Sequence, residues 1–504
     1  MTVLALDAGT TGVTALLVTP DGGIVARGYQ EFPQHFPRPG WVEHEPEQIW
    51  VAVLSACRDA LAAGDLAGAA RPTAVGLTNQ RETVVLWERR TLRAPRRAVV
   101  WQDRRTAALC ADLEREGHGP RVTALTGLRL DPYFSATKLR WLSEHDPASW
   151  AGVLAGSVAV GTVDAYLVAR LSGGARAATD PSNASRTLLY DTFAGEWSDE
   201  LCALFRVPVG ALPEVVPSSG EVARTDPDAF LGLDLPIAGI AGDQQAALFG
   251  QACYQPGSSK CTYGTGSFVL VNTGAAPVRS DAGLLTTVAW DLGDGPVFAL
   301  EGAVFVTGAA VQWLRDGLGI IGSASEVEGL AALVPDTGGV YFVPALTGLG
   351  APHWDPAARG TIVGITRGTN RSHLARATLE AIAFEVRDVV DVMAASIVEV
   401  AGAGVDDVIA ELSVDGGASA NDLLCQLQAD QLGVGVRRPR VVETTGLGAA
   451  FLAGLGTGVW ASTHELADTW RLDRRFEPTA GARTDGRHAR WRDAVRRAGG
   501  WAEE

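Results

Sequence analysis

Asp243 follows an apolar run and precedes two amides, a placement that suits a general base. Residues 235–241 have the composition of a buried strand, and Gly242 breaks this run just before Asp243-Gln244-Gln245. A phosphoryl-transfer enzyme needs a carboxylate at such a strand end to accept the proton of a substrate hydroxyl. The same pattern also fits a helix N-cap, because Asp is a preferred capping residue and residues 246–249 favour a helix.

The Gly/Thr-rich segment of residues 7–12 is a candidate phosphate-binding turn. Glycines let backbone amides approach an anion, threonine hydroxyls add donors, and a carboxylate at Asp7 can hold hydrated Mg²⁺ against phosphates. The segment is neither a Walker A loop nor a Rossmann fingerprint, since no Gly-Lys-Ser/Thr follows it. A type I′ hairpin turn uses the same residue types, so the segment fits either a nucleotide tail or an ordinary hairpin.

Two further Gly-rich segments could face a nucleotide. Residues 414–421 run from an apolar strand into a Gly-Gly turn, which would give a purine a flat floor with Asn421 at its edge. Asn421 could equally be the N-cap of the helix that follows. Residues 301–308 precede a helix that contains Gln312, and Gly308 would allow close approach of either a nucleotide or a neighbouring helix.

The adjacent opposite charges of Arg81 and Glu82 suit a small polyol. Such a pair can bracket two vicinal hydroxyls, and buried groups left unpaired by the wrong substrate give large discrimination. A salt-bridged pair on an exposed loop would instead contribute little. Residues 99–105 and 130–138 are also dense in aromatic and polar types, which is unusual for plain core.

The elements that must position these residues alternate between strand and helix patterns. The first three runs read as a β-meander, and the following helix and strands indicate an α/β layered domain. The expected segments are strands 3–7, 13–18 and 23–28, helix 47–62, and strands 74–77 and 84–87.

The opening hairpin has a weaker echo at residues 261–271, about half a chain later. With 504 residues the chain exceeds the roughly 250 to 300 at which single cores stop growing. We therefore expect two related domains, 1–250 and 251–504, each opening with a phosphate-facing hairpin, although Gly/Thr turns are common enough for a chance echo. From about Thr463 the sequence predicts a C-terminal helix or extension packed on the second domain.

Charge and cysteine usage exclude several function classes. The net charge of -16 argues against non-specific binding to nucleic acid or to an anionic membrane. No apolar stretch approaches the ~20 residues of a membrane span, and no signal segment is recognisable. The six cysteines form no CxxC pair and read as reduced core thiols. We expect a cytoplasmic protein without nucleic-acid or membrane partners.

Taken together, these segments resemble the FGGY carbohydrate kinases, and within them the glycerol kinases. The similarity runs from Asp7 to about Trp460. It is carried by the strings TNQRET, VVWQDRRT, DPYFSATKL, TDPSNASRT, GDQQAALFGQ, TYGTG, ALEGAVF, GLGAPHWDPAARG and VDGGASAN.

The resemblance implies two actin/hexokinase-like (ribonuclease H-like) α/β domains around a central cleft for ATP and a small triol. The implied activity is that of an ATP:glycerol 3-phosphotransferase, with glycerol as substrate and ATP and Mg²⁺ as cofactors. Asp243 would be the catalytic base on the terminal hydroxyl of glycerol. The residues implied to bind glycerol are Arg81, Glu82, Trp101, Tyr133, Asp243, Gln244 and Phe268. Those implied for the nucleotide are Thr10, Thr11, Gly12, Thr14, Thr265, Gly308, Gln312, Gly417 and Asn421, and those for the metal are Asp7 and Asp243.

Two positions depart from the pattern of the family. Glycerol kinases usually carry an Arg at the position of Thr14, so a charged phosphate contact is missing here. Members inhibited by fructose 1,6-bisphosphate carry an Arg where this chain has Asp234, and we expect no such inhibition because an acid repels a phosphate. The family leads us to expect a homodimer or homotetramer. Alternatives are an FGGY kinase for another polyol or a ketose, and an actin- or chaperone-like ATP-driven binding protein.

Overall fold

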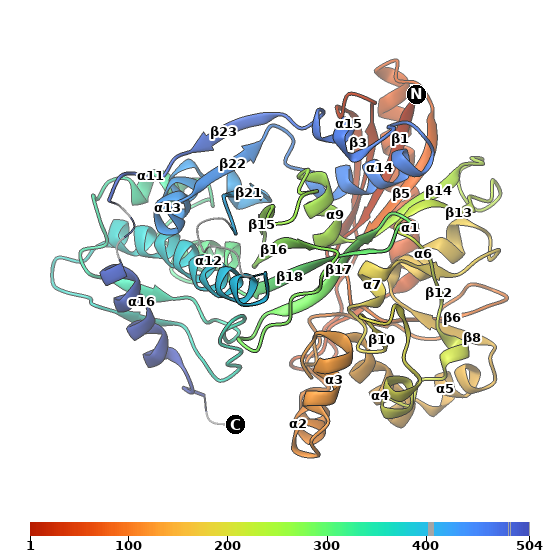
Figure 1. The fold of residues 1–504 in the computed structure, drawn as a ribbon, viewed down its shortest axis with the longest axis horizontal. Coiled ribbons are helices and arrows are strands. Elements are labelled where there is room, and N and C mark those ends of the chain that lie inside the picture. The colour runs from red at the N-terminus through yellow and green to blue at the C-terminus, as the bar shows by residue number, and fades with distance from the viewer. Residues whose placement is uncertain (402–407, 482, 484, 503–504) are drawn as a thin grey trace.

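Two large mixed sheets form the frame of the molecule (Figure 1). The computed structural model describes residues 1–401, 408–481, 483 and 485–502. The first sheet has the strand order β13-β14-β5-β1-β2-β3 and the second β17-β18-β16-β15-β21-β22-β23. All strands of the first sheet precede residue 250 and all strands of the second follow it, so we retain 1–250 and 251–504 as the proposed domains.

The first sheet contains the predicted runs 3–7, 13–18, 23–28, 74–77 and 235–241, and the second contains the predicted hairpin at 261–271, whereas the predicted run 84–87 belongs to a separate short strand pair. The first sheet comprises β1 (Thr2–Ala8), β2 (Gly12–Val18), β3 (Ile24–Glu31), β5 (Pro72–Asn79), β13 (Ser219–Arg224) and β14 (Pro236–Gly242). The second comprises β15 (Ser259–Tyr263), β16 (Ser267–Gly274), β17 (Leu285–Asp291), β18 (Pro296–Val304), β21 (Glu411–Asp415), β22 (Gly435–Pro439) and β23 (Leu472–Phe476).

The two sheets share one topology, which confirms the predicted echo of the opening hairpin. In each, the first strand of the unit pairs with an antiparallel meander on one side and with parallel strands on the other. The matching cores are β3-β2-β1-β5-β14 and β18-β16-β15-β21-β22. This is the ribonuclease H-like arrangement that the family resemblance implied, and it occurs twice.

Helices from both ends of the chain cover the first sheet. Leu17 of β2 contacts the position of Gly64 in α1 (Pro46–Leu66), whereas its neighbour Leu16 contacts Gly446 in α14 (Thr444–Gly456). Successive strand residues point to opposite faces, so α1 and α14 cover opposite faces of this sheet. Figure 1 shows the late helix α14 beside the early strands β1 and β5. The second half of the chain therefore returns to complete the core of the first.

The backbones of α14 and α9 (Asp243–Gly250) pack directly against each other. A Cβ placed on Gly448 would lie 1.8 Å from the carbonyl oxygen of Ala246, and one placed on Gly250 would lie 2.0 Å from that of Thr444. Only glycine permits such an approach. These glycines press α14 against the helix that begins at Asp243.

The remaining helices and strands pack around the two sheets. In the first half the helices are α2 (Ala107–Arg115), α3 (Gly119–Thr126), α4 (Ser135–His145), α5 (Pro147–Leu154), α6 (Val163–Leu171), α7 (Pro181–Ala184) and α8 (Asp199–Leu204). Those of the second half are α10 (Gly308–Asp316), α11 (Glu326–Ala331), α12 (Arg371–Ala401), α13 (Asp422–Leu432), α15 (Thr463–Ala467) and α16 (Asp485–Ala498). Short strand pairs are β4 (Glu43–His44) with β7 (Ala98–Val99), β6 (Val85–Glu88) with β8 (Val158–Gly161), β9 (Ala178–Thr179) with β12 (Glu214–Val215), β10 (Tyr190–Asp191) with β11 (Glu196–Trp197), and β19 (Tyr341–Val343) with β20 (Thr361–Val363).

The C-terminal region differs from the expected helical extension. Besides α15 and α16 it contributes the strand β23, which pairs with β22 at the edge of the second sheet. The sequence did not predict this strand, because its three central residues are charged and most of its side chains are exposed. Residues 482, 484, 503 and 504 of the predicted extension lie outside the described residues.

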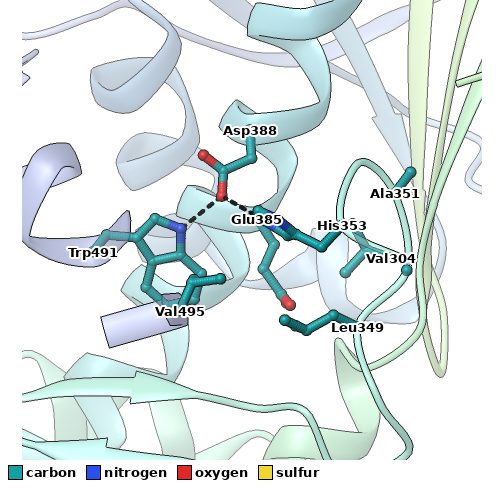
Figure 2. Close-up of a pocket in the computed structure, with 9 residues that line it drawn as sticks. Val304, Leu349, Ala351, His353, Glu385, Asp388, Trp491 and Val495 are labelled. Atoms are coloured by element: carbon teal, nitrogen blue, oxygen red, sulfur yellow. Dashed lines mark hydrogen bonds and ion pairs between the residues drawn. The ribbon is translucent and has the colours of Figure 1, made fainter. Parts of the chain in front are cut away.

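Asp388 of α12 anchors the C-terminal helix α16. Its Oδ1 lies 2.6 Å from His488 Nε2, and its Oδ2 accepts a hydrogen bond of 2.7 Å from Trp491 Nε1. His353 Nε2 is 3.8 Å from the same carboxylate. Figure 2 shows the small cavity beside this cluster, which Glu385 also lines. Burial and the neighbouring Asp388 raise the pKa of Glu385 well above its ordinary value.

All six cysteines are buried as free thiols, as the sequence predicted. Among the described residues, no helix is long and apolar enough to cross a membrane.

Candidate active site

Asp243 lies at the end of β14, in the first turn of α9. The N-cap is Gly242, whose amide donates to Ser182 Oγ at 2.9 Å, so the N-cap interpretation of Asp243 is wrong. The Asp243 side chain is 29% exposed and stands at the positive end of a helix dipole. A partly exposed carboxylate in this position can meet a substrate hydroxyl.

Arg81, just after β5, is held by carboxylates from both halves of the chain. Its Nη1 lies 2.5 Å from Glu301 Oε2, and its Nη2 lies 3.1 Å from Glu301 Oε1. Its Nε lies 3.1 Å from Asp243 Oδ1. The two terminal nitrogens also donate to Gln245 Oε1 at 3.2 Å and to the Tyr133 hydroxyl at 3.3 Å. Arg81 therefore fixes the orientation of the candidate base.

Glu82 and Glu301 both bind the guanidinium group of Arg186. Arg186 Nε donates to Glu82 Oε1 at 2.7 Å, and its Nη2 donates to Glu301 Oε1 at 2.9 Å. Glu82 is fully buried and has a φ of 61°, a left-handed backbone that is costly for a residue other than glycine. Burial raises the pKa of Glu82, and the charges of Arg81 and Arg186 oppose that shift.

Glu301 and Arg186 belong to this network, although no role was predicted for either. Burial acts to raise the pKa of Glu301, but the guanidinium groups of Arg186 and Arg81 overcome it and hold the pKa at about 2. The available sequence signal was a charged residue inside the otherwise apolar strand β18, which is unusual unless the charge is paired. Arg186 lies in one of the family-like strings, TDPSNASRT.

Aromatic side chains line the same region. The rings of Trp101 and Tyr133 meet edge to face with centroids 5.6 Å apart, and Phe268 of β16 lies under the Arg81 guanidinium at 6.0 Å. Trp101 Nε1 donates to Thr10 Oγ1 at 2.9 Å. The predicted polyol-binding aromatics thus contact both the arginine network and the first phosphate-facing turn.

The predicted nucleotide residues of the first half lie in the β1–β2 hairpin. Thr10 and Thr11 form its turn, Gly12 begins β2, and Thr14 is the cross-strand partner of Asp7. The Thr14 side chain, where the resemblance leads us to expect an Arg, is half-buried. As the cross-strand partner of Asp7, it lies on the same face of the sheet as that carboxylate.

The predicted nucleotide residues of the second half gather at the equivalent hairpin. The amide of Gly308 donates to the Gly264 carbonyl at 3.0 Å, and the amide of Ala309 to the Thr265 carbonyl at 3.1 Å. A Cβ on Gly308 would lie 2.6 Å from the Gly264 oxygen, so glycine is needed for the hairpin to reach the start of α10. Gln312 is exposed one turn further along α10.

The Gly-Gly turn after β21 adjoins the same hairpin. Gly416 has a φ of 80°, and a Cβ there would lie 2.5 Å from the Tyr263 carbonyl oxygen. Gly417 is exposed and begins the short 3₁₀ segment Gly417–Ala420, which Asn421 follows. Asn421 is the N-cap of α13 and accepts a hydrogen bond of 2.8 Å from the Leu424 amide. The capping alternative is therefore confirmed, and the Asn421 side-chain amide nitrogen is not used by that cap.

Asp7 lies in a region of excess negative charge. Burial, followed by the charges of Asp243 and Glu443, raises its pKa to about 7. A divalent cation would relieve this repulsion, and carboxylate oxygens are the ligands that Mg²⁺ prefers. Among the described residues, no group of three or more His, Cys, Asp or Glu side chains could enclose a metal ion. The set therefore fits an ion held mainly by phosphate and water, as Mg²⁺ is in nucleotide sites.

Asp234, which bears on regulation, is exposed and paired with Arg224, with Nε and Oδ1 2.7 Å apart. The absence of inhibition by fructose 1,6-bisphosphate stays a prediction.

Two family models match this chain and together cover most of it. The N-terminal domain of the FGGY family of carbohydrate kinases matches residues 2–250, and the C-terminal domain of that family matches residues 259–457.

Full-length relatives agree with this match. A glycerol kinase of Aromatoleum aromaticum is 55% identical over 500 residues, which cover 99% of this chain and 99% of that protein. Among solved structures, Plasmodium falciparum glycerol kinase with ADP has a TM-score of 0.89 at 32% identity and covers 99% of this chain and 98% of its own. A xylulose kinase from Rhodospirillum rubrum has a TM-score of 0.83 at 26% identity, covering 98% and 97%.

Proposed function

Because this chain belongs to the FGGY family of carbohydrate kinases, we propose that it transfers the γ-phosphoryl group of ATP to glycerol, giving sn-glycerol 3-phosphate and ADP. Similarity to glycerol kinases at full length favours glycerol over the sugars of other FGGY kinases.

The observation that carries the proposal is the placement of Asp243 against Arg81. A carboxylate that is 29% exposed stands at a strand end, and a fully buried guanidinium fixes one of its oxygens at 3.1 Å. The other oxygen is then available to accept the proton of a substrate hydroxyl. A positioned base of this kind contributes typically ~10² to 10⁴-fold to the rate.

We assign substrate binding to the residues around this pair. Glu82 offers a carboxylate acceptor and Tyr133 a hydroxyl beside Arg81, while Trp101 and Phe268 supply apolar surface for the carbon chain. Gln244 adds an amide beside the base. Acceptors and donors at fixed points suit a molecule with a hydroxyl on every carbon, because a substrate that lacks one leaves a buried group unpaired.

The nucleotide is assigned to the two hairpins and the turns beside them. Backbone amides and hydroxyls of Thr10, Thr11 and Thr265 can hold phosphate oxygens, and the Gly417 turn can support the base. Asp7 and Asp243 would hold Mg²⁺, which supplies charge neutralisation to the phosphates when bound. Since the transferred phosphoryl group has a loose, charge-spread transition state, positioning and electrostatics supply most of the catalysis. Cytoplasmic localisation and assembly as a homodimer or homotetramer remain part of the proposal.

One acceptor assay tests the proposed function against its rivals. The release of ADP from ATP is measured without acceptor and then with glycerol, dihydroxyacetone, erythritol, xylulose and other ketoses. We expect turnover to depend on an acceptor and to be fastest with glycerol. Preference for a ketose would support a different FGGY kinase, and acceptor-independent turnover would support an ATP-driven binding protein.

A further inference from the structure

Lys260 is a buried cation at the junction of the two halves, and the proposed mechanism has not used it. It is one of two lysines in the chain and is fully buried in β15. Burial lowers its pKa, and the charges of Asp415 and Asp243 oppose that shift. A charge this costly to bury is retained only where specific partners need it.

The Lys260 ammonium group donates a hydrogen bond to Gln244, the residue next to the candidate base. Its Nζ donates to Gln244 Oε1 at 2.5 Å and to Thr262 Oγ1 at 2.8 Å. Thr262 lies two residues along the same strand, whereas Gln244 lies in the first turn of α9. The contact with Gln244 therefore joins the second sheet to the helix that carries Asp243.

This contact selects which end of the Gln244 amide faces the substrate region. An ammonium group only donates, so it must meet the amide oxygen and not the amide nitrogen. Gln244 Nε2 is thereby directed away from Lys260, and within the described residues it donates a hydrogen bond to no protein acceptor. If the partner could also accept a hydrogen bond, the Gln244 amide could flip and present its oxygen to the substrate region instead.

We infer that Lys260 is a positioning residue that orients Gln244 so that Nε2 donates to a hydroxyl of glycerol beside Asp243. The inference rests on the proposed function and deepens it. Asp243 must accept a proton from one hydroxyl of glycerol. A neighbouring Nε2 group can only donate a hydrogen bond, so it binds glycerol differently from Asp243 and holds the substrate in one orientation. Lys260 would act through Gln244 and need not touch the substrate.

A double-mutant cycle between Lys260 and Gln244 tests this role. Lys260→Met keeps the length and apolar stem of the side chain but removes the donor. We expect Lys260→Met and Gln244→Leu each to raise the KM for glycerol about tenfold, the size of one lost hydrogen bond to a charged or oriented partner. In the double variant the KM should rise no further than about twofold above either single variant, because both changes remove the same interaction. Additive effects on the glycerol KM would overturn the inference.

Two matched variants separate positioning from folding. Lys260→Arg retains a charged donor and should recover part of the lost glycerol affinity, whereas Gln244→Glu keeps an acceptor for Lys260 and deletes the Nε2 donor. We expect Gln244→Glu to raise the glycerol KM while the ATP KM and the thermal midpoint stay near those of the unchanged protein. An unchanged glycerol KM in Gln244→Glu contradicts the inference even if Lys260→Met does not fold.

The same measurements show whether the proposed function fails or only the role of Lys260. If the unchanged protein does not phosphorylate glycerol, the proposed function fails. If it does and the cycle is additive, only the role of Lys260 fails.

Discussion

Arg81 and Glu301 form a bidentate ion pair between the two halves of the chain. The Nη1–Oε2 and Nη2–Oε1 distances are 2.5 and 3.1 Å, and the two side chains are 1% and 0% exposed. Arg81 follows a strand of the first sheet, whereas Glu301 lies in a strand of the second. The orientation of the candidate base thus depends on a residue from the other half of the molecule.

Glu301→Gln should damage both stability and catalysis. It leaves the guanidinium groups of Arg81 and Arg186 buried with one fewer counter-charge, which typically costs about 3 to 5 kcal/mol when a buried pair is broken. We expect a comparable loss in the free energy of unfolding and a fall in kcat/KM for glycerol of at least about 100-fold. The control is Glu200→Gln, which removes an exposed pair with Arg121 and should change stability by less than about 1 kcal/mol. Equal effects of the two substitutions in urea unfolding and kinetics would contradict this account.

Gly448→Ala should prevent close packing of α14 on α9. The added Cβ would lie 1.8 Å from a backbone oxygen that cannot move without shifting the helix of Asp243. We expect a loss of stability of about 3 kcal/mol or more, with a parallel loss of activity. Gly486→Ala in α16 is the matched control, because nothing lies near its Cβ position and alanine favours a helix. Thermal unfolding of both variants checks the prediction, and a Gly448→Ala protein as stable as the control would refute it.

Thr14→Arg should strengthen nucleotide binding. Thr14 is the cross-strand partner of Asp7 at the first hairpin, where a guanidinium group could form charge-assisted hydrogen bonds with phosphate oxygens. We expect the KM for ATP to fall by about tenfold, with little change in the KM for glycerol. Val25→Arg adds the same charge at an exposed position of β3 and should leave both constants unchanged. An ATP KM that is unchanged or higher in Thr14→Arg would show that this position does not face the phosphates.

The buried carboxyl of Glu385 should make stability fall as the pH rises. Burial and Asp388 raise its folded pKa well above 4.5, whereas the unfolded chain ionises it near 4.5. Above that pH the folded state holds a proton that the unfolded state has lost, so the free energy of unfolding decreases. Glu385→Gln removes this titrating group, so its free energy of unfolding, measured by urea titration, should decline less steeply between pH 5 and 8, by up to about 1.4 kcal/mol per pH unit. The exposed Glu196→Gln is the control. Parallel pH profiles for Glu385→Gln and the unchanged protein would rule this out.

Local patterns in the sequence were enough to predict the elements that carry the site. The Gly/Thr turns at residues 9 and 265 and the strand before Asp243 could be recognised because turn residues, apolar runs and their spacing are local features. From the same features only the repeated hairpin was predicted, and the duplicated ribonuclease H-like topology came from the resemblance to the FGGY kinases. The strand β23 was not predicted, because its exposed charged residues resemble a loop.

The partners of the site residues could not be read from the sequence. Arg81 and Glu301 are separated by 220 positions, and Arg186 and Glu82 by 104. Which of the charges in the chain meet depends on how segments far apart in the sequence are brought together by the fold, and local spacing carries no information on that. The close approach of Gly448 to α9 has the same origin, because it depends on the return of α14 to the first sheet.

The role of Asp243 as the base that deprotonates glycerol is tested most directly by Asp243→Asn. The asparagine keeps the shape of the side chain but cannot accept the proton. The measurement is the rate of glycerol 3-phosphate formation in a single turnover, with the ATP affinity titrated in the same preparation. We predict an ATP affinity within about twofold of that of the unchanged protein and a transfer rate lower by ~10² to 10⁴-fold. Transfer at more than about a tenth of the original rate would contradict the assignment of Asp243 as the base.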